Sequence, residues 1–158
     1  MTRLILSYLA ALITGAVIVS IANTHIVLEG LVGIGANIPT PVRIEAIQRD
    51  LVGFGPTLLA LLAIGFAIAF PVAGLIARWL GEGWRRIGYA LAGATAVFTL
   101  INAITIYYNA VLGSTITPVA SGRDVTGLLV LSIGGAAAGL LFAVLKPARH
   151  LDQGYQRQ

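Results

Sequence analysis

The chain has 158 residues, of which 58% are hydrophobic and only 10% are charged, with a formal net charge of +4. Soluble domains carry about 25% charged residues, so this composition is typical of a membrane protein. It contains no cysteine, which excludes thiolate catalysis, disulfide exchange and iron–sulfur clusters. The excess of basic residues flanks apolar stretches and forms no separate basic region, so we expect no nucleic-acid partner.

Four charge-free apolar stretches follow one another along the chain: Leu4–Ala22, Pro56–Ala77, Gly88–Tyr108 and Gly127–Leu145. A helix of roughly 20 apolar residues spans a hydrocarbon core about 30 Å thick. The pattern therefore predicts an all-α integral membrane protein with a bundle of four transmembrane helices. The spans leave no room for a soluble domain, so residues 1–158 are expected to form a single membrane domain.

The first stretch also resembles a signal peptide, because Arg3 precedes an apolar run and Ser20-Ile21-Ala22 resembles a cleavage site. The run is longer than the apolar region of a typical signal peptide. We therefore expect it to be retained as the first span.

Basic residues indicate the orientation, because Lys and Arg concentrate in cytoplasmic loops. With the N-terminus inside, three basic residues fall in the outer segments: Arg43, Arg49 and Arg123. Seven fall in the inner segments: Arg3, Arg78, Arg85, Arg86, Lys146, Arg149 and Arg157. This predicts cytoplasmic N- and C-termini, and the composition favours a bacterial inner membrane.

The first outer connection contains a second kind of helix. Thr40 is a favourable N-cap and Pro41 a favourable first helical residue. Ile44, Ile47 and Leu51 then recur at helical spacing among polar residues. We expect a short amphipathic helix on the outer face, lying along the membrane or over the bundle.

The two halves of the chain resemble a tandem duplication, with repeat 1 at 1–80, repeat 2 at 81–145 and a short cytoplasmic tail at 146–158. Each unit holds two spans, so the copies run in the same direction about an axis along the membrane normal. The matches occur in the same order: Tyr8, Thr14, Ala22 and Thr24 with Tyr89, Thr95, Ala103 and Thr105; Thr40-Pro41-Val42 with Thr117-Pro118-Val119; and Arg49-Asp50, Gly53 and Gly65 with Arg123-Asp124, Gly127 and Gly139.

The repeated Arg-Asp pairs stand before the second and fourth spans. Asp50 and Asp124 are placed to cap those helices and meet the positive end of the helix dipole. Arg49 and Arg123 can contact lipid phosphate or a partner, or pair with an acid of the other half. Capping and anchoring is the favoured interpretation, and an outer site for an anion or a lipid headgroup is the alternative.

His25 and Glu29 share a helix face if the first helix continues past Ala22. A zinc site needs three or four ligands, and the sequence shows no third ligand nearby. An interfacial polar pair is therefore favoured over a metal site or a proton relay, and no metal or other cofactor is expected.

The most polar face inside a span carries Asn102, Thr105 and Asn109. Such residues in bilayers usually form hydrogen bonds between helices, and we expect them to do so here. Lining a polar pocket or contacting a quinone headgroup is the alternative.

Small residues are abundant in the second and fourth spans, including Gly134, Gly135 and Gly139 in the fourth. Small residues let helix backbones approach closely in lipid. We expect these two spans to pack against each other or against a partner, and Pro71 to bend the second span mildly.

The four cores contain no Asp, Glu, Lys, Arg or His, although such residues mark proton relays and ion paths in membranes. We therefore expect no catalytic residues and no enzymatic activity. The leading hypothesis is an accessory or structural subunit that binds membrane lipids and other integral membrane subunits through its small-residue faces. The alternative is a small oligomeric permease or channel for a neutral or lipophilic solute, and a lipid- or quinone-handling enzyme is the third hypothesis.

Overall fold

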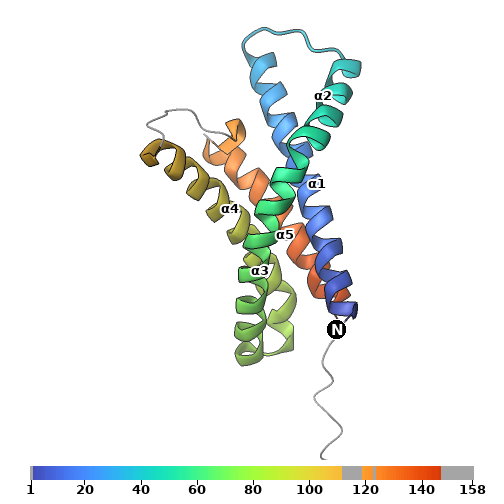
Figure 1. Ribbon diagram of the computed structural model, residues 1–158, viewed down its shortest axis with the longest axis vertical. Helices are drawn as coiled ribbons and strands as arrows, with labels where there is room; N and C mark the ends of the chain where they lie inside the picture. Colours follow the sequence, from blue (N-terminus) through green and yellow to red (C-terminus); the bar gives the residue numbers. More distant parts are fainter. Residues whose placement is uncertain (1, 112–118, 123, 147–158) are drawn as a thin grey trace, which may run out of the picture.

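The computed structural model of the chain is entirely helical over the residues it describes, which are 2–111, 119–122 and 124–146 (Figure 1). Arg123, Thr117-Pro118 and the tail beyond Lys146 lie outside these residues. The elements follow in the order α1 (Thr2–Gly33), α2 (Thr40–Gly53), α3 (Gly55–Leu80), η1 (Glu82–Trp84), α4 (Arg85–Val111), η2 (Ala120–Gly122) and α5 (Val125–Leu145).

Four of these helices, α1, α3, α4 and α5, are long and apolar enough to cross a membrane. They contain the four predicted stretches, and most extend beyond them. α1 continues to Gly33, so His25 and Glu29 lie on helical backbone one turn apart. α3 continues through Pro71 without interruption and ends at Leu80.

The amphipathic helix is confirmed as α2, although its first turn is shifted by one residue. Pro39 occupies the N-cap position with extended backbone angles, and the helix begins at Thr40. α2 packs against the C-terminal part of α1 and leads through Phe54 into α3 (Figure 1). None of its residues is fully buried, because it has neighbours on one side only.

The long helices form a closed ring in which α1 contacts α3, α3 contacts α4, α4 contacts α5, and α5 contacts α1. At one end, here called the η1 end, lie η1, the start of α1 and the end of α5 (Figure 1). At the other, the α2 end, α4 diverges from α1 and α2 (Figure 1).

The backbones of α4 and α5 touch at three glycines. A Cβ atom at Gly93 would overlap the carbonyl oxygen of Gly135, and one at Gly135 would overlap the carbonyl oxygen of Gly93. One turn further along α5, a Cβ at Gly139 would overlap the carbonyl oxygen of Tyr89. Only glycine permits this approach, because any larger residue places an atom where the facing backbone already lies.

The other face of α5 packs on α1 through small residues as well. A Cβ at Gly134 would lie 2.9 Å from Val19 Cγ2, and one at Gly15 of α1 would lie 3.0 Å from the Cβ of Ala138. The predicted close packing of the second and fourth spans is therefore wrong. The small residues of α5 hold it between α4 and α1, and α3 lies across the ring.

Aromatic side chains fill the space between α3 and α5 in the half of the bundle toward the η1 end. Phe70 of α3 stacks on Phe142 of α5, with ring centroids 4.5 Å apart. Tyr8 of α1 and Tyr89 of α4 meet these rings edge-on from either side. The Tyr8 hydroxyl donates a hydrogen bond of 2.5 Å to the carbonyl of Ala63, so the bundle axis is closed at this level.

The close contact between α4 and α5 predicts that one added methyl group at this interface lowers the stability of the bundle. Replacing Gly139 with Ala forces the two backbones apart and should lower the free energy of unfolding by about 1–3 kcal/mol. Gly88 is the matched control, because a Cβ there meets open space on α4. Gly88→Ala should be neutral or stabilise the helix by up to about 1 kcal/mol. Thermal unfolding followed by circular dichroism in a mild detergent measures both. Equal melting temperatures for the two variants would contradict the close contact.

Candidate functional site

Asp50 joins α1 to α2 at the α2 end of the bundle. Its Oδ2 atom accepts hydrogen bonds from Ser20 Oγ at 3.0 Å and from Thr24 Oγ1 at 2.8 Å. Both hydroxyl residues are buried on α1, one turn apart. The predicted capping of α3 by Asp50 is wrong: Asp50 lies inside α2, and the N-cap of α3 is Phe54, which makes no side-chain cap bond.

Asp124 behaves differently from Asp50. It occupies the predicted N-cap position of α5 with extended backbone angles, but it makes no side-chain cap hydrogen bond. Its side chain is exposed. The two aspartates that match in the sequence therefore have different surroundings, because only Asp50 faces a pair of buried hydroxyls.

Of the two arginines in the Arg-Asp pairs, Arg49 lies within the described residues. Arg49 is exposed and pairs with Glu45 one turn earlier on α2, at 2.6 Å between Nη2 and Oε1. Arg123 lies outside the described residues. Arg49 thus remains available at the surface, held in an i,i+4 pair of small energetic weight.

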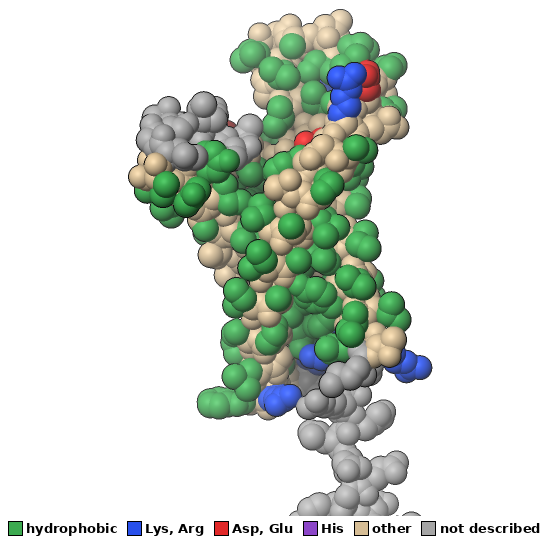
Figure 2. All heavy atoms as spheres, viewed as in Figure 1, with side chains coloured by type: hydrophobic (Ala, Val, Ile, Leu, Met, Phe, Trp, Pro, Cys, Tyr) green, Lys and Arg blue, Asp and Glu red, His purple; other side chains and the backbone are tan. Residues whose placement is uncertain are grey.

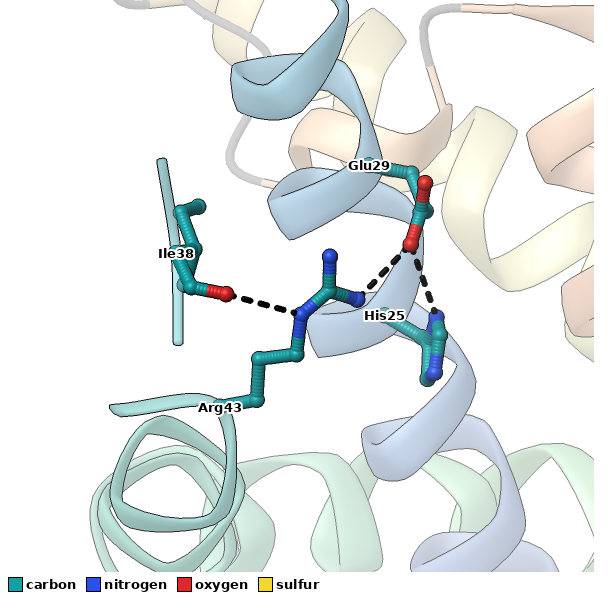
Figure 3. Close-up of polar contacts among 4 residues, drawn as sticks. All are labelled: His25, Glu29, Ile38 and Arg43. Atoms are coloured by element: carbon teal, nitrogen blue, oxygen red, sulfur yellow. Dashed lines mark hydrogen bonds and ion pairs between the residues drawn. The ribbon is translucent and has the colours of Figure 1, made fainter. Parts of the chain in front are cut away.

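His25 and Glu29 come together, with Arg43 of α2 as the third member (Figure 3). Arg43 Nη1 lies 2.7 Å from Glu29 Oε1, and His25 Nδ1 lies 3.9 Å from the same oxygen. Arg43 Nε also donates to the carbonyl of Ile38 at 3.4 Å. Glu29 lies beyond the apolar stretch Leu4–Ala22, and its hydrogen bond to Arg43, together with the charge of that residue, lowers the pKa of its carboxyl below the usual value.

This cluster is suited to joining helices and unsuited to holding a metal. The guanidinium of Arg43 binds Oε1 of Glu29 and places a positive charge beside it, and an arginine carries no free electron pair to donate to a metal. Within the described residues, no group of three or more metal-ligating side chains is assembled. The cluster instead fastens α2 to the last turns of α1.

A further polar contact links α1 to the short helix η2, where the Ser121 hydroxyl donates to Asn23 Oδ1. Sequence reasoning missed Ser20, Thr24, Asn23 and Ser121. One signal was present: Ser20 and Thr24 stand at i and i+4 within an apolar run, so they share a face. Their acceptor, Asp50, is distant in the sequence and needed the structure to be found.

A small cavity lies next to these contacts, between α1, α3 and α4. Its volume is about 20 Å³, which is room for about one water molecule. Its lining is aliphatic and aromatic apart from Asn23. A solute has no room there unless the helices separate.

Among the described residues, Asn102 and Thr105 of α4 do not form the predicted interhelical hydrogen bonds. Asn102 Nδ2 donates to the carbonyl of Phe98 at 2.8 Å, and Thr105 Oγ1 donates to that of Ile101 at 2.9 Å, both within α4. Asn109 is exposed. The expectation of bonds to neighbouring helices is therefore wrong for Asn102 and Thr105.

Most of the polar residues of α4 face outward and share one side of the helix. Thr95, Thr99 and Asn109 are exposed, and Asn102 is half-buried. Their spacing of three, four or seven residues places them along one line, which we call the polar stripe.

Gly134, Gly135 and Gly139, by contrast, are buried by α1 and α4, so the chain itself covers the glycines that were expected to contact lipid or a partner.

No protein-family model matches the chain, and comparison with curated proteins and with solved structures finds no significant match. Its function is therefore inferred from its own geometry.

The two aspartates should differ in their contribution to stability. Asp50→Ala leaves the buried Ser20 hydroxyl without its acceptor, whereas Thr24 keeps the carbonyl of Ser20 as an acceptor at 3.1 Å, and the change should cost about 1–2 kcal/mol. Asp124→Ala, the matched control, removes an exposed carboxylate without a cap bond and should cost about 0.5 kcal/mol or less. Thermal unfolding in detergent separates the two. A larger loss of stability for Asp124→Ala would restore the capping interpretation. It would also contradict a stabilising role for the hydrogen bonds of Asp50 with Ser20 and Thr24.

Proposed function

We propose that the protein is a multi-pass membrane protein of a bacterial inner membrane, with both termini in the cytoplasm and the α2 end outside. The four long apolar helices support this placement. Figure 2 adds that hydrophobic side chains cover the shaft of the bundle and that Lys and Arg side chains lie toward its ends. Trp79 and Trp84 are exposed at the η1 end, where the headgroup region of the inner leaflet would lie.

The tandem duplication remains part of this proposal. In the ring, α1 contacts α5 and α3 contacts α4, as two hairpins related by a pseudo-twofold axis would require. Tyr8 and Tyr89, which match in the two halves, also meet the same pair of phenylalanine rings. The copies have diverged, because the glycine contact joins only α4 and α5.

Within the membrane, we propose that the protein is an accessory subunit that docks on another membrane protein through the outward face of α4. The observation that carries this proposal is the polar stripe. On the outward face of α5, between Leu129 and Val144, the exposed large side chains are aliphatic, and α4 is the least hydropathic of the four long helices.

The chemistry of the stripe supports a protein neighbour. An asparagine amide offers two N–H donors and a carbonyl acceptor, and within the described residues Asn102 uses one N–H, for its own helix. Facing hydrocarbon, the remaining groups would have no partner. Facing another helix, they can form interhelical hydrogen bonds of roughly 0.5–2 kcal/mol each. Thr95, Thr99 and Ala103 add a row of small side chains that allows a close approach.

The two other hypotheses have less support. Conduction through a single bundle meets the stacked rings of Phe70 and Phe142 on the axis. The enzyme hypothesis relied on His25 and Glu29, and Arg43 engages Glu29 directly. Docking through α4 is therefore the function that the geometry favours.

Site-specific photocrosslinking in native membranes tests the docking surface. A photoreactive residue at Ile106, which lies on the line of the polar stripe and is 65% exposed, should give an adduct with one defined membrane protein. The matched control is Ile133 on α5, which is 67% exposed and should give lipid adducts only. Asn102→Leu should weaken docking by about 3- to 20-fold, which corresponds to one interhelical hydrogen bond, and should lower the adduct yield at Ile106.

Two results would overturn the proposal. One is the same adduct pattern at Ile106 and Ile133. The other is crosslinking at Ile106 only to a second copy of this chain, which would identify the stripe as a self-association surface.

A further inference from the structure

The η1 end gathers cations around a half-buried lysine. Lys146 follows the last turn of α5, and its Nζ atom donates a hydrogen bond of 2.6 Å to the hydroxyl of Tyr89. The same atom lies 5.0 Å from the centroid of the Tyr89 ring and 5.5 Å from that of Phe142. The ammonium group is thus held in place by a neutral phenol and two aromatic faces.

Arg85 is fixed beside Lys146 by the end of α5. Its Nη2 atom donates to the carbonyl of Ala143 at 2.8 Å and to that of Lys146 at 3.4 Å. Gly74 of α3 faces the same point, because a Cβ there would lie 3.6 Å from Lys146 Nζ. Arg78 stands one turn beyond Gly74, so it lies on the same side of α3. Arg78, Arg85 and Lys146 come from three helices, and we call them the basic cluster.

Among its described contacts, which do not include those of the Glu82 side chain on η1, the basic cluster has no anion. Its hydrogen-bond acceptors are carbonyl and phenol oxygens, which carry no formal charge. The three ion pairs that the described residues form, Arg43–Glu29, His25–Glu29 and Arg49–Glu45, all lie at the α2 end. Arg85 and Lys146 are partly removed from water, so their charges repel each other, and a shared anion relieves that repulsion.

The surroundings of the cluster select the kind of anion. Trp79, near the end of α3, is 87% exposed, and Trp84, the last residue of η1, is 52% exposed; Leu80 and Leu145 are about half exposed at the same end. Indole rings favour the headgroup level of a bilayer, and exposed leucines suit acyl chains. The arrangement therefore places positive charge at headgroup depth above an apolar surface, as a phospholipid requires.

We propose that the basic cluster is a binding site for the phosphate of an anionic phospholipid, with Lys146 and Arg85 as its main contacts. The site rests on the proposed membrane placement, and it is independent of docking through α4. A lipid bound at this site stabilises the η1 end of the bundle, because one phosphate would bridge the ends of α3, α4 and α5.

Tryptophan quenching in vesicles tests this site directly, since Trp79 and Trp84 are the two tryptophans of the chain and both adjoin the cluster. The purified protein is reconstituted in phosphatidylcholine with increasing amounts of phosphatidylglycerol, and either lipid carries bromine on its acyl chains. Brominated phosphatidylglycerol should quench more strongly at equal mole fraction. The preference should fall about fivefold in Lys146→Gln and in Arg78→Gln, and it should weaken with added salt.

The controls distinguish lipid binding at the basic cluster from the general electrostatic attraction between a cationic protein and an anionic membrane. Arg49→Gln removes an exposed cation at the α2 end and should leave the preference unchanged, and Lys146→Arg should retain it. Inorganic phosphate added to the protein in detergent should not raise its melting temperature. Arg78 is exposed, so its variant stays informative if Lys146→Gln does not fold.

Each failure has a separate meaning. Equal quenching by the two brominated lipids, an unchanged preference in both cluster variants, or stabilisation by phosphate alone would overturn the lipid site. Absence of quenching by either brominated lipid would overturn the membrane placement itself.

Discussion

The direct contact between the backbones of α4 and α5 sets the geometry of the whole bundle. At Gly93, Gly135 and Gly139 the separation of these helices is determined by main-chain atoms. Such contacts gain dispersion energy over a long interface, which is the principal source of helix association in lipid. Because the opposite face of α5 also carries small residues, α1 approaches it as well, and α5 becomes the most enclosed helix of the ring.

With α5 held between α4 and α1, α3 lies across the ring, and large side chains fill the remaining space. Phe70 and Phe142 stack there, and the tyrosines of α1 and α4 seal the stack from both sides. The contacts of charged side chains with other elements accordingly occur near the ends of the bundle. At the α2 end, the Asp50 carboxylate serves two buried hydroxyls, and at the η1 end Tyr89 receives the Lys146 ammonium.

The secondary structure was largely readable from the sequence, whereas the direction in which each face points was not. Hydropathy and proline placement predicted the four long helices and α2, because a helix satisfies its own backbone locally. Whether Gly134 or Asn102 faces a neighbour depends on the rotation of each helix about its axis. In an all-apolar helix that rotation leaves no periodic pattern to detect. Asp50 was misjudged for a related reason, since its hydroxyl donors lie on another helix and a local cap was the nearest explanation.

The glycines and the polar residues of this bundle occupy the opposite faces from those expected of a membrane helix. Glycines in a membrane helix suggest an outer surface for a partner, and amides suggest bonds inside a bundle, but here the chain uses its glycines internally and turns Thr95, Thr99 and Asn109 outward. A polar side chain facing lipid lowers the stability of the isolated chain, whereas the same side chain against another helix can add to affinity. The cost is recovered only in a complex, which is why the polar stripe points to a neighbouring protein more strongly than the glycines do.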